Sequence, residues 1–371
     1  MPPAWIHTAL AQQIVFGEGS VARLPELVRT VGARRVLLIT TPGRAASPEG
    51  EAIERSLGRA LASSFALAEA HVPAPVVQQA VLQARRDNID AVVSFGGGSC
   101  SDLGKAVCFF LEQEAGMPGA SHVDRPAIAH LSIPTTYSGA ELTPFFGMTD
   151  PGTGQKQGAG GPTSAPLVAV YDPVLTLSTP ARVSAETGMN ALAHCVEAVW
   201  SVHRTPEAEA IALAGATAIQ RWLPQVVQHP DDLEARGGML EGACLAGRCL
   251  HNAGMGVHHG LAQLLGGRTR LPHGLVNAVL LAHSVRFNAP AVPDAVTRLG
   301  AALGAPGEGG AADAIDGLRA TLGLPAGLRE VGVGEDDLEA VARLSQSSAV
   351  VRANPRPVDE GAALELLRAA W

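Results

Sequence analysis

The sequence lacks the marks of membrane, secreted and nucleic-acid-binding proteins. None of its apolar runs approaches the ~20 uncharged residues that a membrane-spanning helix needs. Its first residues, MPPAWIHTALAQQ, have neither the basic start nor the apolar stretch of a signal peptide. Lys and Arg number 27 against 35 Asp and Glu, which gives a net charge of −8, and no basic block could neutralise a row of phosphates. We therefore expect a soluble cytoplasmic protein with neither nucleic acid nor membrane as a partner.

Cysteine is also scarce, and its spacing is not that of a disulfide framework. The five cysteines are Cys100, Cys108, Cys195, Cys244 and Cys249. Their number is odd and no two form a CxxC pair, so we expect reduced thiols. Cys100 lies beside a glycine-rich loop, and we interpret it as a small buried thiol rather than a reactive one.

What is present is enough apolar sequence for two domains. The chain has 371 residues, of which 47% are hydrophobic. Up to about residue 178, apolar runs typical of strands alternate with runs typical of helices. The expected strands cover residues 12–16, 34–40, 63–72, 90–96, 129–136 and 165–173, and the expected helices cover 20–32, 51–62, 73–88 and 101–112. This alternation predicts an α/β domain with a parallel, Rossmann-like sheet, residues 1–178. From about residue 182 only helical periodicity remains, which predicts an all-α domain, residues 179–371.

A glycine loop follows the fourth expected strand, in the segment FGGGSCSDLGKAV. Glycines let a backbone approach a pyrophosphate, and the start of the next helix favours its charge. Ser99 or Ser101 is a candidate helix cap or phosphate ligand. Thr135 and Thr136 follow the next strand and should emerge at the same edge of the sheet. The segment matches neither the Rossmann fingerprint nor the P-loop, so a tight turn without a ligand stays an alternative.

Two later segments concentrate residues suited to a catalytic site. In GMNALAHCVEAVW, residues 188–200, helical spacing places Asn190, His194 and Glu197 on one face. In GMGVHHGLAQLLGGRTRLPHG, residues 254–274, His259 lies in a helical run that Gly266 and Gly267 should stop, and His273 opens the next helix. We therefore expect the two histidines at the end of one helix and the start of another, in a site where the two domains meet.

Together these segments resemble the iron-containing (group III) alcohol dehydrogenase superfamily, which also includes dehydroquinate-synthase-like proteins. The resemblance covers essentially the whole chain and includes VFGEGSVARLPELV, FGGGSCSDLGKAV, SIPTTYSGAELTP and VAVYDPVLTLSTP besides the histidine segments. Within the superfamily the chain is most similar to the maleylacetate reductases, through the doubled His258-His259 and the late segment ANPRPV. The resemblance implies an NAD(P)H-dependent oxidoreductase, a homodimer, that reduces an enone acid such as maleylacetate to 3-oxoadipate.

The resemblance also implies roles for individual residues. In metal-dependent relatives an Asp and three His bind Fe²⁺ or Zn²⁺, and here those positions are Asn190, His194, His259 and His273. An amide is a poorer ligand than a carboxylate for a hard dication, so we expect catalysis by these four residues without a metal. The residues expected to bind NADH or NADPH are Thr41, Pro42, Gly96, Gly97, Gly98, Ser99, Asp102, Thr135, Thr136 and Lys156.

Some positions depart from the maleylacetate reductases. Gln263 stands where many relatives have His, Gly260 and Gly274 replace Lys and Ala, and residues 154–166 replace a more basic stretch. Arg268, Arg270 and Arg356 are candidate partners for substrate carboxylates, or solvated surface residues. Two alternatives therefore stay open: a dehydrogenase or carbonyl reductase of the same fold in another pathway, and a lyase or isomerase that keeps the fold. The preference between NADH and NADPH is open as well.

Overall fold

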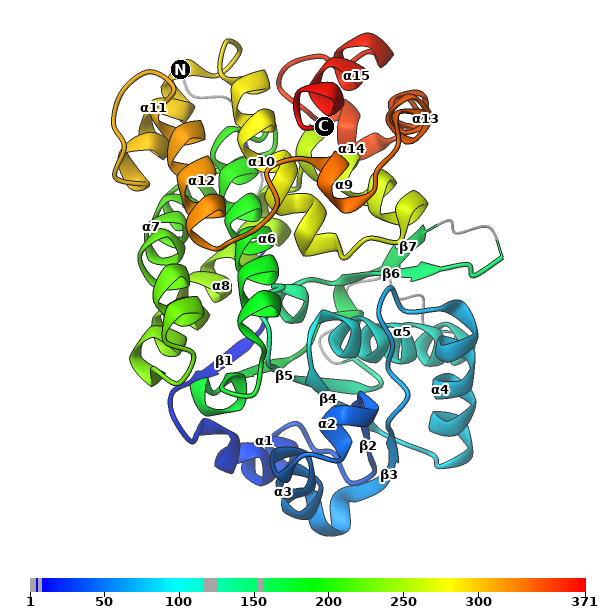
Figure 1. Ribbon diagram of the computed structural model, residues 1–371. Helices are drawn as coiled ribbons and strands as arrows, with labels where there is room; N and C mark the ends of the chain where they lie inside the picture. Colours follow the sequence, from blue (N-terminus) through cyan, green and yellow to red (C-terminus); the bar gives the residue numbers. More distant parts are fainter. Residues whose placement is uncertain (1–4, 6–8, 117–125, 153–155) are drawn as a thin grey trace. The chain divides into compact units, whose positions relative to one another are not determined.

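The computed structural model describes residues 5, 9–116, 126–152 and 156–371, and the chain forms two compact units, Ala9–Ser178 and Thr179–Trp371 (Figure 1). The first unit is built on a parallel sheet. Its strands lie in the order β1 (Gln13–Phe16), β8 (Val168–Tyr171), β5 (Ala129–Pro134), β4 (Ala91–Gly96), β2 (Val36–Thr40) and β3 (Leu61–Phe65). Every neighbouring pair is parallel. The predicted α/β fold is confirmed for this unit.

Helices cover both faces of this sheet. In β2, Val36 and Leu38 pack into one core with α1 (Leu24–Thr30) and α3 (Pro48–Leu57). Leu37 and Ile39 pack into another with α4 (Ala74–Arg86) and α5 (Gly98–Glu114). Because successive side chains of a strand point to opposite faces, a strand buried on both faces is apolar throughout. This explains why the run VLLIT was recognisable as a central strand.

Two expectations for this unit were wrong in detail. The strand expected at 63–72 is β3, Leu61–Phe65, because α3 ends at Leu57 and Gly58 turns the chain with φ 52°. A hairpin of β6 (Phe145–Thr149) and β7 (Lys156–Gly160) was not expected at all. Its second strand, KQGAG, has neither β-branched residues nor apolar alternation, so pairing with β6 rather than local propensity forms it.

The second unit is helical, as predicted, with no strand among its described residues. Its long helices are α6 (Ala181–Trp200), α7 (Pro206–Gln228), α8 (Leu233–Ala253), α9 (Val257–Thr269) and α10 (His273–Asn288). They are followed by α11 (Pro293–Ala302), α12 (Gly310–Thr321), α13 (Glu335–Ser345), α14 (Ala349–Arg352) and α15 (Glu360–Ala369). None of the described helices is both long and apolar enough to cross a membrane.

Helix α6 is the centre of this unit. Every residue from Gly188 to Trp200 is buried, and α7, α8 and α10 pack around the helix. Gly188 lets α7 approach closely, since a Cβ there would lie 2.4 Å from Leu223 Cδ1. A helix buried all round has few positions for polar groups, so those that α6 carries need partners.

Candidate functional site

The predicted nucleotide-binding residues of the first unit follow three adjacent strands. Thr41 and Pro42 follow β2, Gly97 and Gly98 follow β4, and Thr135 and Thr136 follow β5. Since β2, β4 and β5 are neighbours in one parallel sheet, these loops emerge at the same carboxyl edge. Ligands of open α/β sheets bind at this edge.

At three positions of the glycine loop a side chain would be crowded or its backbone conformation strained. A Cβ at Gly97 would lie 3.2 Å from Thr136 Cγ2, and one at Gly98 would lie 2.8 Å from Ser138 Oγ. Gly96 has φ 145°, a conformation that other residues rarely adopt. Glycine therefore lets this loop pack closely against the segment that follows β5.

The helix after the loop begins earlier than expected and without a side-chain cap. Helix α5 starts at Gly98 with Gly97 as its N-cap, so the expectation that Ser99 or Ser101 caps it was wrong. Both serines lie inside the first turn, and the buried Ser101 Oγ has no hydrogen-bond partner. Cys100 is buried as predicted, and burial raises its pKa to about 12, which makes it an inert thiol.

The other predicted cofactor residues are engaged within the protein or lie outside the described side chains. Thr41 is the N-cap of the short helix α2 (Pro42–Ala45), accepting a hydrogen bond from the Arg44 backbone N–H at 3.3 Å. The Asp102 carboxylate pairs with Lys105 Nζ at 2.7 Å. Lys156 begins β7, and its side chain lies outside the described part of the structure.

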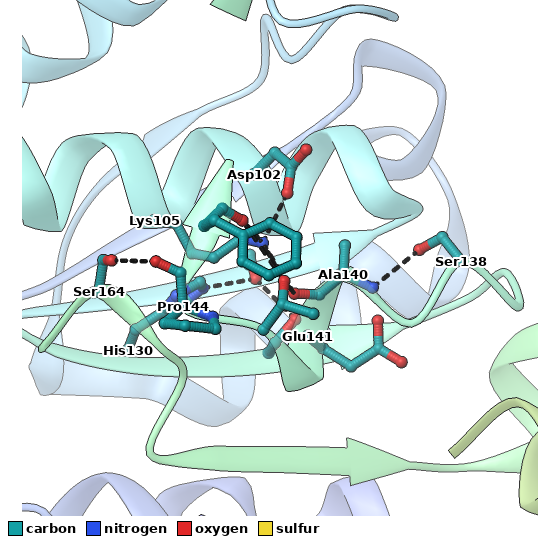
Figure 2. Close-up of polar contacts among 12 residues, drawn as sticks. Asp102, Lys105, His130, Ser138, Ala140, Glu141, Pro144 and Ser164 are labelled. Carbon is teal, nitrogen blue, oxygen red and sulfur yellow. Dashed lines mark hydrogen bonds and ion pairs between the residues drawn. The ribbon is translucent and has the colours of Figure 1, made fainter. Parts of the chain in front are cut away.

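Lys105 links α5 through hydrogen bonds to the segment that follows β5 (Figure 2). Its fully buried ammonium group donates to the carbonyl oxygens of Ala140, at 2.8 Å, and Phe145, at 2.5 Å. A third bond, of 3.0 Å, reaches Thr143 Oγ1. With Asp102 this gives the buried charge four oxygen partners, so Lys105 ties the segment after β5 to α5.

In the second unit the predicted catalytic histidines lie close together. His194 comes from α6, His259 from the first turn of α9, and His273 is the first residue of α10. The rings of His194 and His259 stack, with centroids 4.7 Å apart and planes at 19°, and those of His259 and His273 are 6.0 Å apart. The structure therefore brings together three side chains that are far apart in the sequence.

The place of His259 within its helix was predicted wrongly. It lies near the start of α9, because Gly266 and Gly267 continue the helix to Thr269 rather than stopping it. A glycine inside a helix is unfavourable by about 1 kcal/mol, which burial of the apolar face of α9 against α10 outweighs. Both His259 and His273 thus stand at helix N-termini.

Glu197, one turn after His194 on α6, contacts His259 through Nδ1 of its ring. Its Oε2 accepts from His259 Nδ1 at 2.7 Å and from the His259 backbone N–H at 3.2 Å. Burial alone would raise the pKa of this carboxyl, but the bonds and charges of the neighbouring histidines bring the pKa below its usual value. Glu197 is therefore a buried carboxylate. The helical spacing placed it on the face of Asn190 and His194 but assigned it no role.

The adjacent His258 is structural rather than ligand-facing. Its Nε2 lies 2.7 Å from Asn277 Oδ1, and its Nδ1 lies 3.2 Å from Ser284 Oγ. Asn277 in turn donates to the His273 carbonyl oxygen at 2.7 Å, which fixes the first turn of α10. Burial lowers the pKa of His258 to about 3, so this histidine is neutral.

Three buried polar atoms of the cluster have no partner: Asn190 Oδ1, His194 Nδ1 and His259 Nε2. Burial, and then the nearby histidines, hold the pKa of His194 well below its usual value, so its ring is neutral. Buried polar groups without partners are rare in native proteins. Their grouping at the predicted site indicates atoms that a ligand satisfies.

The candidate partners for substrate carboxylates are partly engaged elsewhere. Arg268 pairs with Asp337 at 2.6 Å on the surface. Arg356 lies over the Phe287 ring, 4.0 Å from its centroid, and donates to the Phe287 carbonyl oxygen at 2.7 Å. Arg270 is exposed and ends α9 with φ 59°. Gln263, where many relatives have His, is exposed as well.

Comparison with known families covers both units. The iron-containing alcohol dehydrogenase family matches residues 11–173, and the C-terminal part of the Fe-containing alcohol dehydrogenase family matches residues 184–371. The chain belongs to the iron-containing alcohol dehydrogenase family. This confirms the predicted membership of that superfamily and the prediction of an NAD(P)H-dependent oxidoreductase.

The similar members of this family include several maleylacetate reductases. The one from Rhizobium sp. (strain MTP-10005) is 38% identical over 367 residues, which are 99% of this chain and 97% of the relative. A maleylacetate reductase structure from Agrobacterium tumefaciens is 36% identical, with a TM-score of 0.87 and coverage of 100% of this chain and 98% of the other. A 1,3-propanediol oxidoreductase structure, 28% identical, covers both chains completely with a TM-score of 0.93.

Replacing Lys105 by Met should destabilise the protein by about 3 kcal/mol, because it leaves Asp102 and three oxygen acceptors without their buried cation. Denaturation by urea, followed by circular dichroism, measures the loss. Arg23→Met is the control, since Arg23 forms an exposed pair with Glu26 whose removal should change stability by less than about 1 kcal/mol. Equal effects of the two substitutions would contradict the structural role of Lys105.

Proposed function

We propose that this protein is an NAD(P)H-dependent reductase of an enone acid such as maleylacetate, which it converts to 3-oxoadipate without a metal. The observation that carries the proposal is the group of unpartnered atoms on Asn190, His194 and His259 beside His273. The maleylacetate reductases that resemble the chain over nearly its full length support the choice of substrate.

We propose that the Ala9–Ser178 unit binds the dinucleotide. The start of α5, which has no side-chain cap and follows the glycine loop, suits a pyrophosphate. The proposed ligand-contacting residues are those predicted from the sequence: Thr41, Pro42, Gly96, Gly97, Gly98, Ser99, Asp102, Thr135, Thr136 and Lys156. Strand β2 ends at Thr40 without a carboxylate that would reject a 2′-phosphate, so NADH and NADPH should both serve.

We propose that the histidines of the Thr179–Trp371 unit carry the proton chemistry. When bound, the nicotinamide supplies a hydride to one carbon of the conjugated double bond. The electron pair of that bond then moves into an enolate, which a hydrogen-bond donor stabilises. Protonation of the neighbouring carbon completes the reduction. His273 at the start of α10 and the N–H₂ group of the Asn190 amide would hold the carbonyl end by donating hydrogen bonds to its oxygen. His259 would deliver the proton from Nε2 when both of its ring nitrogens are protonated, and Glu197 would keep the remaining proton on Nδ1 after the transfer.

The residues present do not fit an iron or zinc ion. Asn190 offers a neutral amide in place of a carboxylate, and both oxygens of the nearby Glu197 accept hydrogen bonds from N–H groups of α9 and Gly256. Conjugate reduction spreads the developing charge over an enolate, so it depends less on a Lewis acid than reduction of an isolated ketone.

A second candidate is a carbonyl reductase of the same family with another substrate. It is favoured by the engagement of Arg268 with Asp337 and of Arg356 with Phe287, which leaves these arginines less suited to a dicarboxylate. The departures at Gly260 and Gly274 do not bear on this choice. A Cβ there would lie 2.4 Å from Val351 Cγ2 and 2.5 Å from the Glu186 carbonyl oxygen, so packing requires glycine at both positions.

We further propose a cytoplasmic homodimer that acts on small carboxylate-bearing molecules. For the class of substrate, this is supported by the maleylacetate reductases to which the chain is similar.

Gly97→Val should raise the Kd of NADH at least about 10-fold, because a branched side chain would fill the space between the loop and Thr136. Quenching of NADH fluorescence in a titration measures the Kd. The backbone of Gly97, at φ −79°, suits valine, so the melting temperature without NADH is the control for folding. Unchanged NADH binding would show that the cofactor does not bind at this loop.

Wild-type protein should oxidise NADH with maleylacetate as acceptor, and His194→Ala, His259→Ala and His273→Ala should each lower kcat by about 10²–10⁴-fold. The Kd of NADH should change less than about threefold, because the Ala9–Ser178 loops are untouched. His229→Ala is the control, since His229 is exposed at the end of α7. Activity on a simple ketone but not on maleylacetate would favour the second candidate, and unchanged kcat in all three variants would reject the histidines.

Purified protein should contain no stoichiometric Fe or Zn and should keep its activity in EDTA. Elemental analysis and the NADH assay test this together. Asn190→Asp restores a carboxylate and should bind Zn²⁺ more tightly than wild type, as measured by calorimetry. About one metal per wild-type chain, with activity lost to EDTA, would contradict metal-free catalysis.

A further inference from the structure

Helix α9 begins without any capping side chain of its own. Its N-cap is Gly256, so the first N–H groups of the helix need acceptors from elsewhere. Glu197 Oε1 accepts from the backbone N–H groups of Gly256 and His258, both at 3.0 Å. Asn354 Oδ1 accepts from the Val257 N–H at 3.2 Å. Two side chains from other parts of the chain therefore cap the helix that carries His259.

Glycine at position 256 makes this capping possible. A Cβ there would lie 2.8 Å from Asn354 Oδ1 and 3.1 Å from Glu197 Oε1. Both capping groups are buried, and Asn354 is held by Asn288, whose side-chain Oδ1 accepts from Asn354 Nδ2 at 2.7 Å. The start of α9 is consequently fixed in position before any ligand binds.

The same carboxylate determines which nitrogen of His259 carries a proton. Three backbone N–H groups donate to Glu197. Because a carboxylate can only accept, the 2.7 Å contact between Glu197 Oε2 and His259 Nδ1 requires a proton on Nδ1. In the neutral ring the proton-free nitrogen is then Nε2, which is buried and without a partner. The stacked ring of His194, at 4.7 Å, limits rotation of His259 away from this orientation.

We propose that Glu197 is the positioning residue of the reaction, which fixes the His259 ring through Nδ1 so that Nε2 is the atom that exchanges a proton with the substrate. This inference rests on the proposed function for its kinetic part. A carboxylate behind a histidine performs this orienting role in catalytic triads on unrelated folds. A purely structural cap would support α9 without governing the tautomer of His259.

The tautomer is tested on the wild-type protein, with no variant that must fold. Long-range ¹H–¹⁵N spectra of protein labelled at histidine distinguish protonated from bare ring nitrogens, and the spectrum of His259→Gln identifies the signals of His259. We expect a neutral His259 with its proton on Nδ1. A proton on Nε2 in the neutral ring would overturn the proposal, whether or not the protein reduces maleylacetate.

Kinetics separate positioning from capping. Glu197→Gln removes the charge and turns an amide N–H₂ towards N–H donors. Asn354→Ala removes the cap on Val257, together with the bonds of Asn354 to Asn288 and to the Arg356 carbonyl oxygen, and leaves Glu197 in place. Both should lower the melting temperature. Glu197→Gln should lower kcat for maleylacetate at least about 10²-fold with the NADH Kd within about twofold, and Asn354→Ala should lower kcat less than about threefold. Equal losses of kcat in the two variants would show that Glu197 acts only as a cap of α9.

The outcomes also separate this inference from the proposed function. If wild-type protein leaves maleylacetate unchanged, the proposed function fails, and the tautomer spectrum still decides the positioning of His259. If wild type is active and Glu197→Gln retains its kcat, the positioning role fails while the reductase assignment stands.

Discussion

The helical unit of this protein depends on one buried carboxylate. Glu197 stands on the central helix α6, whose neighbours exclude water, and a charge there is tolerated only because four N–H groups surround it. Three of these belong to the backbone at the start of α9. The interaction therefore couples the buried centre of the helical unit to the orientation of His259.

The sheet unit also contains a buried charge, which is positive. Lys105 is one of only two lysines in the chain, and its ammonium group is enclosed by Asp102 and three oxygens of residues 140–145. An ion held in this way specifies a unique arrangement of its partners, since any other arrangement leaves the charge unpaired. In each unit a buried ion thus fixes the loop or helix start that carries the candidate site.

The sequence predicted the parts of the structure that depend on local pattern. The runs around Val36–Thr40 and Ala91–Gly96 are apolar because both faces of those strands are covered, and the histidine face of α6 follows from helical spacing. Prediction from the sequence failed where a contact with a distant residue determines the local structure. Gly266 and Gly267 remain helical through packing, and KQGAG becomes a strand through its partner. The acceptors of Lys105 lie 35–40 residues away, beyond the reach of any spacing rule.

The cap on Val257 has a consequence for the order in which the protein forms. Asn354 lies 97 residues after the N–H group that it accepts, and Glu197 lies about 60 residues before it. Contacts between such distant residues form late, because the intervening chain must first be ordered. During synthesis, Glu197 is made before α9, but Asn354 is made only after α10 to α14. The helix that bears His259 is therefore among the last parts of this unit to acquire its final form, so newly made chains should bury their core before they become competent for catalysis.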